Sequence, residues 1–587
     1  MFAPLAASLL ALRQSTRFRH CTNARIKVDI STRNSCNELH LAYAAAIFNS
    51  LVTTPAQKPS RSGSSKRHAF LVGSGILLSR IAGLVRERVF AHYFGNSDAA
   101  DAFKAAFRIP NFLQNLFGEG VLSASFIPVY ARLLAREDNE EARRTAGAVA
   151  GLLALTTSII VLIGVLATPY LFYLIAPGFH GEKRELTIRL VRILFPGAGL
   201  LVFSAWCLGV LNSHRRFFLS YAAPVIWNAA MIATLGGFGR HYSQYPLAGI
   251  VAWGSVVGSA LQVGVQLPVV LRLLGGLRIS FRYQAENVMA VVRNFVPVFI
   301  SRGVVQISAY VDGLLASLLG TGAYAALSYA QTLYLLPVSL FGMAVSAAEL
   351  PAMSGARGDE KEVAAVLRGR LNAGLRQIAF FVLPSAVAFL VLGDVIVAAI
   401  YQTGRFTPAD VIYVWGILAG ATVGLLAQTL GRLYSSTYYA LGDTRTPLRF
   451  AIVRVVLTTI LGYLCAIPLP PALGIEPRWG VAGLTISAGI SSWVEFTLLR
   501  RTLNRRIGKS GLPAEYLVKL WVSALAGAAG GWTIHHFLEH VAPVPAAVLA
   551  LGAYGAIYFA VTLALGIAEA RSLLGRATGA FGSAYKT

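Results

Sequence analysis

Long apolar segments recur along the chain from Phe70 to Ile567 and are separated by short polar connections. Each segment has about 20 residues, which is the length of an α-helix that crosses a bilayer, whereas a membrane β-strand needs only about 10. The pattern therefore predicts an all-α polytopic membrane protein with about fourteen transmembrane helices. Their predicted centres are Leu78, Leu116, Ile160, Leu200, Ala230, Val257, Ser308, Leu335, Phe381, Gly424, Thr459, Ile486, Ala526 and Tyr554.

The hydrophobic pattern contains an internal repeat. The sequence LFGEGVLSASFIP at Leu116 to Pro128 recurs as LFGMAVSAAELP at Leu340 to Pro351, about six predicted helices later. A spacing of six helices preserves the orientation in the membrane, so the halves are expected to be two parallel repeats around a central cavity. The predicted domains are an N-lobe at 67–284, a C-lobe at 285–511, and a C-terminal helix pair with a cytoplasmic tail at 512–587.

Residues 1–66 differ from the rest of the chain because they are basic, polar and rich in Ser, Thr and Pro. Such a composition cannot bury a hydrophobic core. The first residues weakly resemble a signal peptide, but they lack its positively charged start. We interpret 1–66 as a disordered N-terminal extension or the result of a mis-assigned start codon.

Charge adds a topology to this pattern. Only 13% of the 587 residues are charged, against about 25% in soluble domains, and the net charge is +25. The basic residues gather in alternate connections, such as 132–144, 272–282 and 500–509, which the positive-inside rule assigns to the cytoplasm. Both termini are therefore expected inside, and the net charge needs no nucleic-acid partner. The four scattered cysteines form no CxxC pair, and no phosphate-binding loop is present.

The first predicted helix, SRIAGLVRERVFAHYF at Ser79 to Phe94, carries four charges that lipid cannot solvate. An arginine at the bilayer centre costs about 2.5–3.5 kcal/mol on insertion scales. Arg80 and Glu87 are seven residues apart and should share a face, Arg86 should point elsewhere, and Arg88 should reach the outer surface. The second helix adds further polar residues, namely Asp101, Lys104, Arg108, Asn111, Gln114 and Glu119, and a kink is expected at Pro110.

Two interpretations account for these charges. The first is ion pairing within the bundle, for example between Arg80 or Arg86 and Asp101 or Glu119. The second is a cationic, water-filled cavity for an anionic headgroup, because the planar guanidinium of arginine binds phosphate with two parallel hydrogen bonds. The excess of cations in one half of the chain favours the cavity.

The motifs SRIAGLVRE, DAF, RIPNFLQNLFGEGVLSASFIPVY and APGF resemble those of the MurJ/MviN lipid II flippases, in the multidrug/oligosaccharidyl-lipid/polysaccharide exporter superfamily. The resemblance extends from about Lys66 to the C-terminus. It implies fourteen helices, two lobes, a central cavity and a lipid-facing groove at the last two helices. The family's functional positions correspond to Ser79, Arg80, Arg86, Asp101, Arg108, Asn111 and Glu119.

The resemblance also implies a substrate and a location. The substrate is the undecaprenyl-pyrophosphate-linked disaccharide pentapeptide of peptidoglycan synthesis, moved from the inner to the outer leaflet of the bacterial inner membrane. Membrane lipids and the cell-wall synthesis machinery are the implied partners.

The sequence departs from the family at several positions. Gln114 replaces an arginine, and Gln331, Thr332 and Leu335 stand where the eighth helix of the family usually carries charges. Arg302 is a candidate replacement for the missing cations in substrate binding, although a local pair with Asp312 is an equal alternative. These departures weaken the assignment to lipid II more than the assignment to a flippase fold.

A sodium site is a further hypothesis. Asp312, Thr458 and Thr485 supply oxygen ligands of the kind that hard cations prefer. Coupling to sodium or to the membrane potential is the only cofactor requirement that we consider.

The function predicted from the sequence is export of a lipid-linked peptidoglycan precursor by alternating access, without covalent chemistry. One alternative is a flippase of the same fold for another polyprenyl-linked glycan. A second is a membrane enzyme acting on lipid-linked sugars, which needs a positioned acid or base. The histidines His535, His536 and His540, after the thirteenth predicted helix, have no evident catalytic partner and are interpreted as surface residues.

Overall fold

The computed structural model describes residues 62–276, 286–538 and 540–575. The chain divides into two units, Met1–Ser60 and Arg61–Thr587. The first unit, which contains most of the predicted extension, lies outside the described residues.

Every secondary-structure element in the described part of the chain is a helix. The helices of the first half are α3 (Ser62–Phe94), α4 (Asp98–Phe117), α5 (Glu119–Ser125), α6 (Ile127–Ala135), α7 (Asn139–Ile175), α8 (Gly181–Ser213), α9 (Phe217–Phe238) and α10 (Gln244–Leu274). Those of the second half are α11 (Glu286–Ser317), α12 (Ala323–Pro337), η2 (Val338–Met343), α13 (Ala344–Ser354), α14 (Glu360–Val391), α15 (Gly393–Tyr401), α16 (Pro408–Ala440), α17 (Arg445–Ala466), α18 (Leu469–Ala472), η3 (Pro477–Trp479), α19 (Gly480–Ile507), α20 (Ala514–Phe537) and α21 (Pro543–Ala564).

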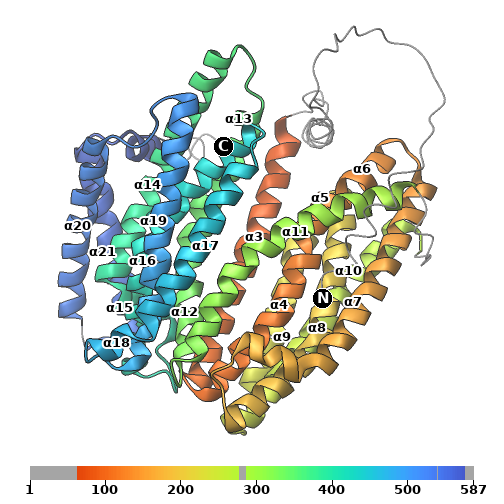
Figure 1. Cartoon of the computed structure of the whole chain (residues 1–587), viewed down its shortest axis with the longest axis horizontal. Coiled ribbons are helices and arrows are strands. Elements are labelled where there is room, and N and C mark those ends of the chain that lie inside the picture. The colour runs from red at the N-terminus through yellow and green to blue at the C-terminus, as the bar shows by residue number, and fades with distance from the viewer. Residues whose placement is uncertain (1–61, 277–285, 539, 576–587) are drawn as a thin grey trace, which may run out of the picture. The chain divides into compact units, whose positions relative to one another are not determined.

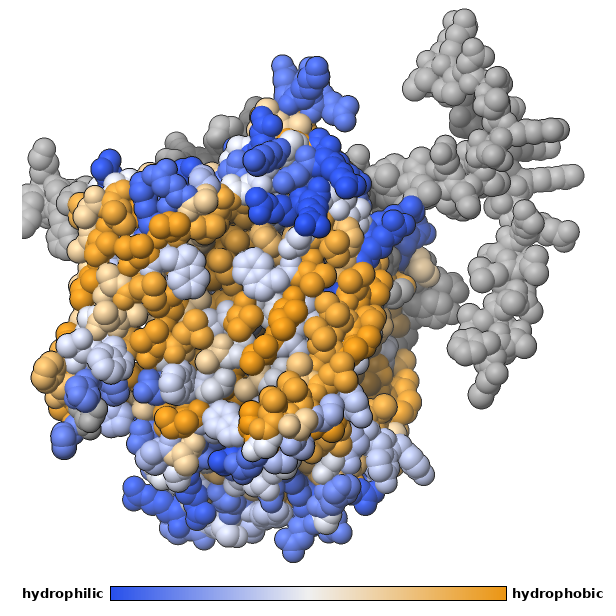
Figure 2. Space-filling model, turned by 60° about the vertical axis from the view of Figure 1, so that its left-hand side comes forward, coloured by the Kyte–Doolittle hydropathy of each residue, from blue (hydrophilic) through white to orange (hydrophobic). Residues whose placement is uncertain are grey.

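The helices have the lengths and surface of a multi-pass membrane protein. Within the described residues, 11 helices are long and apolar enough to cross a bilayer. The long helices α3, α4 and α11, which carry the charged residues of interest, are not among them, so the count of fourteen stays a prediction. Figure 2 shows a broad hydrophobic band between two hydrophilic ends. Exposed apolar side chains such as Leu162, Leu166, Val456 and Ile460 on α7 and α17 form part of the apolar surface.

The helices pack in two groups, which we call the N-lobe (α3–α10) and the C-lobe (α11–α19). In the N-lobe, α8 packs on α4, α7 and α10, and α9 packs on α3 and α10. In the C-lobe, α16 and α19 form the central pair, with α14, α12 and α17 against them. Figure 1 shows α20 and α21 beside α14 and α15. This grouping agrees with two repeats and a final pair, while the residue boundaries of the lobes stay a prediction.

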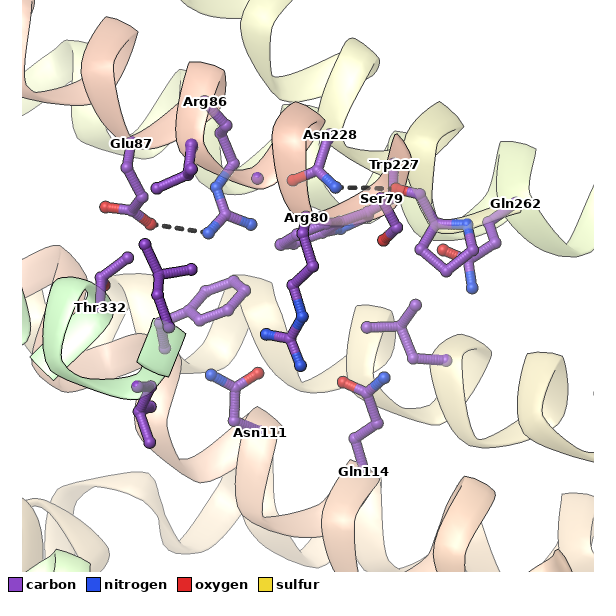
Figure 3. A pocket seen from close by; sticks show the side chains of 17 residues that line it. Ser79, Arg80, Arg86, Glu87, Asn111, Gln114, Trp227, Asn228, Gln262 and Thr332 are labelled. Atoms are coloured by element: carbon purple, nitrogen blue, oxygen red, sulfur yellow. Dashed lines mark hydrogen bonds and ion pairs between the residues drawn. The ribbon is translucent and has the colours of Figure 1, made fainter. Parts of the chain in front are cut away.

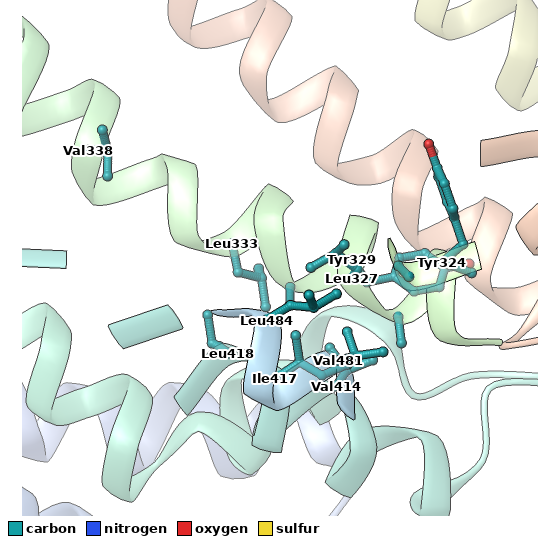
Figure 4. Close-up of a cluster of buried hydrophobic side chains, with 14 of the residues drawn as sticks. Tyr324, Leu327, Tyr329, Leu333, Val338, Val414, Ile417, Leu418, Val481 and Leu484 are labelled. Carbon is teal, nitrogen blue, oxygen red and sulfur yellow. The ribbon is translucent and has the colours of Figure 1, made fainter. Parts of the chain in front are cut away.

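The C-lobe core is an apolar contact of α12 with α16 and α19. Leu327 and Leu333 of α12 face Ile417 of α16 and Leu484 of α19, and all four are almost fully buried (Figure 4). The central helices approach most closely at a glycine pair, because a Cβ atom on Gly424 would lie 2.5 Å from the Cα of Gly489.

Each half of the internal repeat contains a helix irregularity at its repeated glycine. The second predicted span is interrupted at Gly118, between α4 and α5, whereas α4 continues as one helix through Pro110. Gly342, the equivalent glycine, lies in the π-helical segment η2 between α12 and α13. The repeated motif therefore marks the same departure from regular helix in both halves.

Asp443 organises the connection between α16 and α17. Its carboxylate accepts hydrogen bonds from the backbone N–H groups of Arg445 and Thr446 at 3.1 and 3.0 Å, and it pairs with Arg506 at 2.7 Å. Partial burial raises the pKa of Asp443, but the bonds from Thr446 and Arg506 outweigh this effect and leave the pKa below its usual value. This connection therefore includes a carboxylate that is ionised at neutral pH.

Candidate functional site: a polar cavity between the lobes

A cavity of about 490 Å³ lies between α3, α4, α9 and α12, where polar groups face one another (Figure 3). Its walls also include one residue each from α8 and α10. Polar and charged side chains supply much of the lining. They are Ser79, Arg80, Arg86, Glu87, Asn111, Gln114, Trp227, Asn228, Gln262 and Thr332.

Glu87 binds two cations at one end of this cavity. Arg86 donates to Glu87 at 2.6 Å, and Lys104 of α4 pairs with the second carboxylate oxygen. The guanidinium of Arg86 also lies 4.7 Å from the ring centroid of Trp227. Because one carboxylate neutralises only one of the two cations, the cluster keeps a positive charge. Arg80 and Arg86 both line the cavity, as a cationic cavity predicts, and Glu87 lines it too. Only the expectation that Arg86 leaves the face shared by Arg80 and Glu87 is wrong.

Arg80 has a different environment. Its side chain is exposed in the cavity and extends from α3 toward Asn111 and Gln114 of α4 (Figure 3). The structure shows no ion pair between Arg80 and any other described residue. Neutral amides face this guanidinium, so its charge is available to an anion that enters the cavity.

The N-lobe wall adds neutral hydrogen-bonding groups. Gln262 donates to the hydroxyl of Ser204 at 2.8 Å, and this hydroxyl donates to Gln266 at 2.6 Å. The side-chain amide of Asn228 donates to the Pro224 carbonyl at 2.9 Å, which leaves the buried side-chain oxygen of Asn228 without a described partner. This wall therefore offers uncharged polar groups beside the cations.

Asp101 lies at the contact between the lobes and not in the lining of the cavity. Its fully buried carboxylate accepts from the backbone N–H groups of Gly322 and Ala325, both at 2.7 Å, and pairs with Lys183 at 2.6 Å. Gly322 and Ala325 form the start of α12, so an N-lobe carboxylate caps a C-lobe helix. The structure thus gives Asp101 a role in holding the lobes together at this end.

Further bonds join the lobes at the same end. Arg88 donates to the carbonyl groups of Ala399 and Ile400 at the end of α15, the second at 3.0 Å. His92 lies 2.8 Å from the Thr403 hydroxyl. The expectation that Arg88 reaches the outer surface is therefore wrong, because its guanidinium caps a C-lobe helix.

Arg108 also contacts the C-lobe. Its guanidinium donates to the Tyr324 hydroxyl at 3.3 Å and lies 5.7 Å from the ring centroid of Tyr310. It also interacts electrostatically with Asp312. The side chains of the predicted site residues Glu119 and Arg302 lie outside the described residues, so neither of their predicted pairs is visible.

The three proposed sodium ligands have separate surroundings. Asp312 interacts electrostatically with Arg108 and Arg454. The hydroxyl of Thr485 donates to the Ile417 and Ala482 carbonyl groups, both at 3.0 Å, and so faces α16. The buried Thr458 hydroxyl has no described partner. The structure shows no contact among these three side chains, and the sodium site stays a prediction.

The C-lobe contains membrane-embedded charges that the sequence analysis did not include. Arg454 of α17 pairs with Glu495 of α19 at 2.8 Å. Arg432 of α16 is exposed near this pair and interacts with it electrostatically. Thr332 and Leu335 of α12, which stand where the family usually carries charges, line the cavity and make that wall neutral.

The Glu87–Lys104 pair was also missed, although the sequence contains a signal for it. The two residues are almost equally far from the turn at Asn96 and Ser97, so adjacent antiparallel helices bring them to the same level. Trp227 and Gln262 had no such signal, because their approach depends on how α9 and α10 pack. Outside the cavity, His535 lies 3.9 Å from Asp394 and His536 stacks on Trp532.

Comparisons with known proteins identify relatives over most of this fold. Residues 90–550 match the family model described as lipid II flippase MurJ. The chain is 31% identical over 447 residues to the lipid II flippase MurJ of Burkholderia cenocepacia, covering 75% of this chain and 84% of the relative. It is also 31% identical over 519 residues to the probable lipid II flippase MurJ of Rhizobium meliloti, covering 84% and 93%.

Solved structures show the same architecture. A structure of lipid II flippase MurJ in an inward closed conformation superposes with a TM-score of 0.70 at 23% identity, covering 86% of this chain and 100% of the other. An inward-facing multidrug transporter of the MOP superfamily gives a TM-score of 0.58 at 17% identity, covering 76% and 100%. These structures support the fold, and the sequence matches establish that the chain belongs to the MurJ family of lipid II flippases.

Proposed function

We propose that the protein is a transporter that moves lipid II, the polyprenyl-pyrophosphate-linked precursor of peptidoglycan, across the bacterial inner membrane. The observation that carries this proposal is Arg80, a cation exposed in a polar cavity and facing neutral amides. A pyrophosphate carries the complementary charge, and arginine binds it with a geometry that lysine cannot reproduce. No step needs a catalytic acid or base.

The arrangement of the lining suggests how the headgroup binds. Arg80, Arg86 and Glu87 line the N-lobe wall, and Lys104, outside the lining, pairs with Glu87. The two arginines bind the pyrophosphate. The amides of Asn111 and Gln114 lie beside Arg80 and bind neutral oxygens of the sugars or of the linkage. The polyprenyl tail stays in lipid throughout, because its transfer into a polar cavity is unfavourable.

The contacts between the lobes suggest an alternating-access cycle. Asp101, Arg88 and His92 hold the two lobes together at the end where α3 meets α4. Opening of the cavity at that end requires these bonds to break, and closure at the opposite end then isolates it from the cytoplasm. Substrate binding biases the two states only through contacts that differ between them.

The transport proposal is tested by depletion of the protein in its native host and replacement with variants. Depletion should cause undecaprenyl-linked disaccharide pentapeptide to accumulate in the inner leaflet. Arg80→Ala should remove its appearance in the outer leaflet while the protein remains in the membrane at normal abundance. Arg144→Ala is the matched control, because Arg144 lies on the exposed start of α7 and its one ion pair among the described residues is with Glu140.

The outcomes separate the alternatives. Normal transport by well-expressed Arg80→Ala protein would contradict the substrate-binding role. Accumulation of a different lipid-linked glycan on depletion would replace lipid II as substrate and leave the flippase mechanism intact.

The proposed orientation places both termini in the cytoplasm, as the basic connections indicate. A cysteine at Ser97, in the connection between α3 and α4, should react with a membrane-impermeant reagent added outside intact cells. A cysteine at Asn139, the first residue of α7, should stay unmodified. The reverse labelling pattern would refute this orientation.

A further inference from the structure

A second cavity lies on the N-lobe, away from the contact between the lobes. It has a volume of about 520 Å³ and is formed by one face of α8 together with α10. Its residues on α8 recur at helical spacing and so share one face. The full lining consists of Glu185, Ile188, Arg189, Arg192, Ile193, Pro196 and Trp253.

The cleft opens on an apolar outer face of the N-lobe. On α10, Trp253, Val257 and Leu261 are 58%, 53% and 49% exposed, and the four-residue spacing places them in one stripe. Large apolar side chains on α7, including Leu162 and Leu166, are 60% and 68% exposed. These surfaces are the ones that contact lipid in a multi-pass membrane protein, so the cleft faces the bilayer and not the central cavity.

The depth of the cleft corresponds to a lipid headgroup region. With a rise of 1.5 Å per residue, Arg189 and Arg192 lie about 12 and 17 Å from the start of α8 at Gly181, in a helix of about 50 Å. A hydrocarbon core of about 30 Å centred on this helix begins about 10 Å from its end. The two guanidinium groups can therefore reach the headgroup level while their stems lie along apolar surface.

The charges of the cleft are not balanced by protein. Arg189 and Arg192 are both exposed, and neither forms an ion pair or a hydrogen bond with a described residue. Glu185 stands one turn before Arg189 and lines the same cleft, yet the two side chains form no ion pair. Even full neutralisation by Glu185 would leave one positive charge at a lipid-facing surface.

We propose that this cleft binds the phosphate group of an anionic phospholipid in the leaflet at the Gly181 end of α8. Arg189 and Arg192 supply bidentate donors to the phosphate, and Trp253 lies along the upper part of the acyl chains, as tryptophan does at membrane interfaces. The site is separate from the substrate cavity and does not depend on the transported molecule.

Trp253 provides a direct readout. The purified full-length chain is reconstituted in phosphatidylcholine vesicles that contain either phosphatidylglycerol or phosphatidylcholine brominated near the top of the acyl chain. Bromine quenches nearby tryptophan, and the contribution of Trp253 is the difference between the chain and its Trp253→Phe variant. Brominated phosphatidylglycerol should quench Trp253 preferentially. Because each arginine contributes about fivefold, the two together should favour phosphatidylglycerol by about 25-fold.

Two double variants make the test specific. Arg189→Gln with Arg192→Gln should remove the preference for phosphatidylglycerol. Arg405→Gln with Arg478→Gln removes two exposed charges from the same end of the molecule but outside the cleft. This control variant should retain the preference for phosphatidylglycerol. If the first double variant does not give monodisperse protein, the single variants carry the test, and each should lose part of the preference.

Three results would overturn the proposal. Equal quenching of Trp253 by the two brominated lipids would show that the cleft does not select an anionic headgroup. A preference that survives the loss of both arginines would show that the charges act elsewhere. Absence of quenching by either lipid would show that protein, such as a second copy of the chain, covers the cleft.

Discussion

The buried carboxylate of Asp101 should control how readily the two lobes separate. In Asp101→Asn, the group loses its charge but keeps its size. The carboxylate accepts two bonds of 2.7 Å from the backbone at the start of α12. Hydrogen bonds to charged groups contribute about 1.5–3 kcal/mol each. The asparagine has one acceptor oxygen in place of two, so it keeps one of the two bonds, and this neutral bond contributes about 1 kcal/mol. The two bonds together contribute about 3–6 kcal/mol, so the contact that closes this end should weaken by about 2–5 kcal/mol.

A change of this size should be visible in the populations of the closed and open states. Because 1.36 kcal/mol corresponds to a factor of ten, the ratio of open to closed molecules should rise by about 30-fold to 5,000-fold. Spin labels on cysteines at His180 and Leu473, both exposed at this end of the molecule, report the separation of the lobes by pulsed electron resonance. The variant should show a longer distance that is minor or absent in the unmodified chain.

Asp98→Asn is the matched control for this experiment. Asp98 shares Lys183 with Asp101, at 2.8 Å, and accepts from the Thr321 hydroxyl of the C-lobe at 3.0 Å, but its side chain is 39% exposed and binds no backbone N–H group of α12. Exposed ion pairs contribute only about 0–1 kcal/mol, so this variant should keep the distances of the unmodified chain. If Asp101→Asn and Asp98→Asn gave the same distance distribution, the reasoning from the two backbone bonds would be refuted.

Three further variants test the packing described above by thermal unfolding in detergent. Glu87→Gln should destabilise the protein by about 3–5 kcal/mol, because two partly buried cations lose the buried carboxylate that they share, and adding Lys104→Gln should recover part of the loss. An additive decrease in stability would contradict the cluster. Asp443→Asn should lower stability by about 1 kcal/mol at neutral pH. The pKa of Asp443 is lower in the folded protein than in the unfolded chain, where it is about 3.9. The difference in stability between the unmodified chain and the variant should therefore persist above about pH 3.9 and vanish as the pH falls through the folded pKa. A difference in stability that did not depend on pH would exclude the ionised carboxylate as its cause. Gly424→Ala should lower the free energy of unfolding by about 1–3 kcal/mol, because the added methyl group forces α16 and α19 apart. Gly264→Ala is the control, because a Cβ at Gly264 meets open space and should leave stability unchanged. Equal melting temperatures of the two variants would refute the close approach of the helices.

The sequence was sufficient for the fold because apolar periodicity and positive connections reflect a requirement of the bilayer itself. A membrane-spanning segment must form the hydrogen bonds of its backbone N–H and C=O groups within itself, because lipid offers no partners. Each long apolar segment is therefore a helix wherever it packs. The repeat at Gly118 and Gly342 added the two-lobe arrangement. Ser79, Arg80 and Asn111 were placed correctly on the cavity because the first two helices carry more polar groups than lipid permits.

The partner of each charge was harder to predict. Arg88 and Asp101 bind backbone groups at helix ends of the opposite lobe, and such partners leave no pattern of side chains in the sequence. Arg86 and Glu87 are adjacent in sequence, which suggested different faces, yet a cavity wall that spans more than 100° of the helix includes both. Arg432 and Arg454 lie in no sequence motif, so the sequence carries no signal for their partners.

The irregularities at Gly118 and Gly342 have a consequence for how the molecule changes shape. A helix with continuous hydrogen bonds resists bending, whereas a break or a π-helical turn leaves a carbonyl group without its usual partner and lowers that resistance. Since the break lies within the second span and η2 within the α12–α13 segment, one half of such a span can tilt while the other stays packed. The two ends of the transporter are then mechanically separate, and one end can be closed while the other widens, as a carrier without an open pore requires.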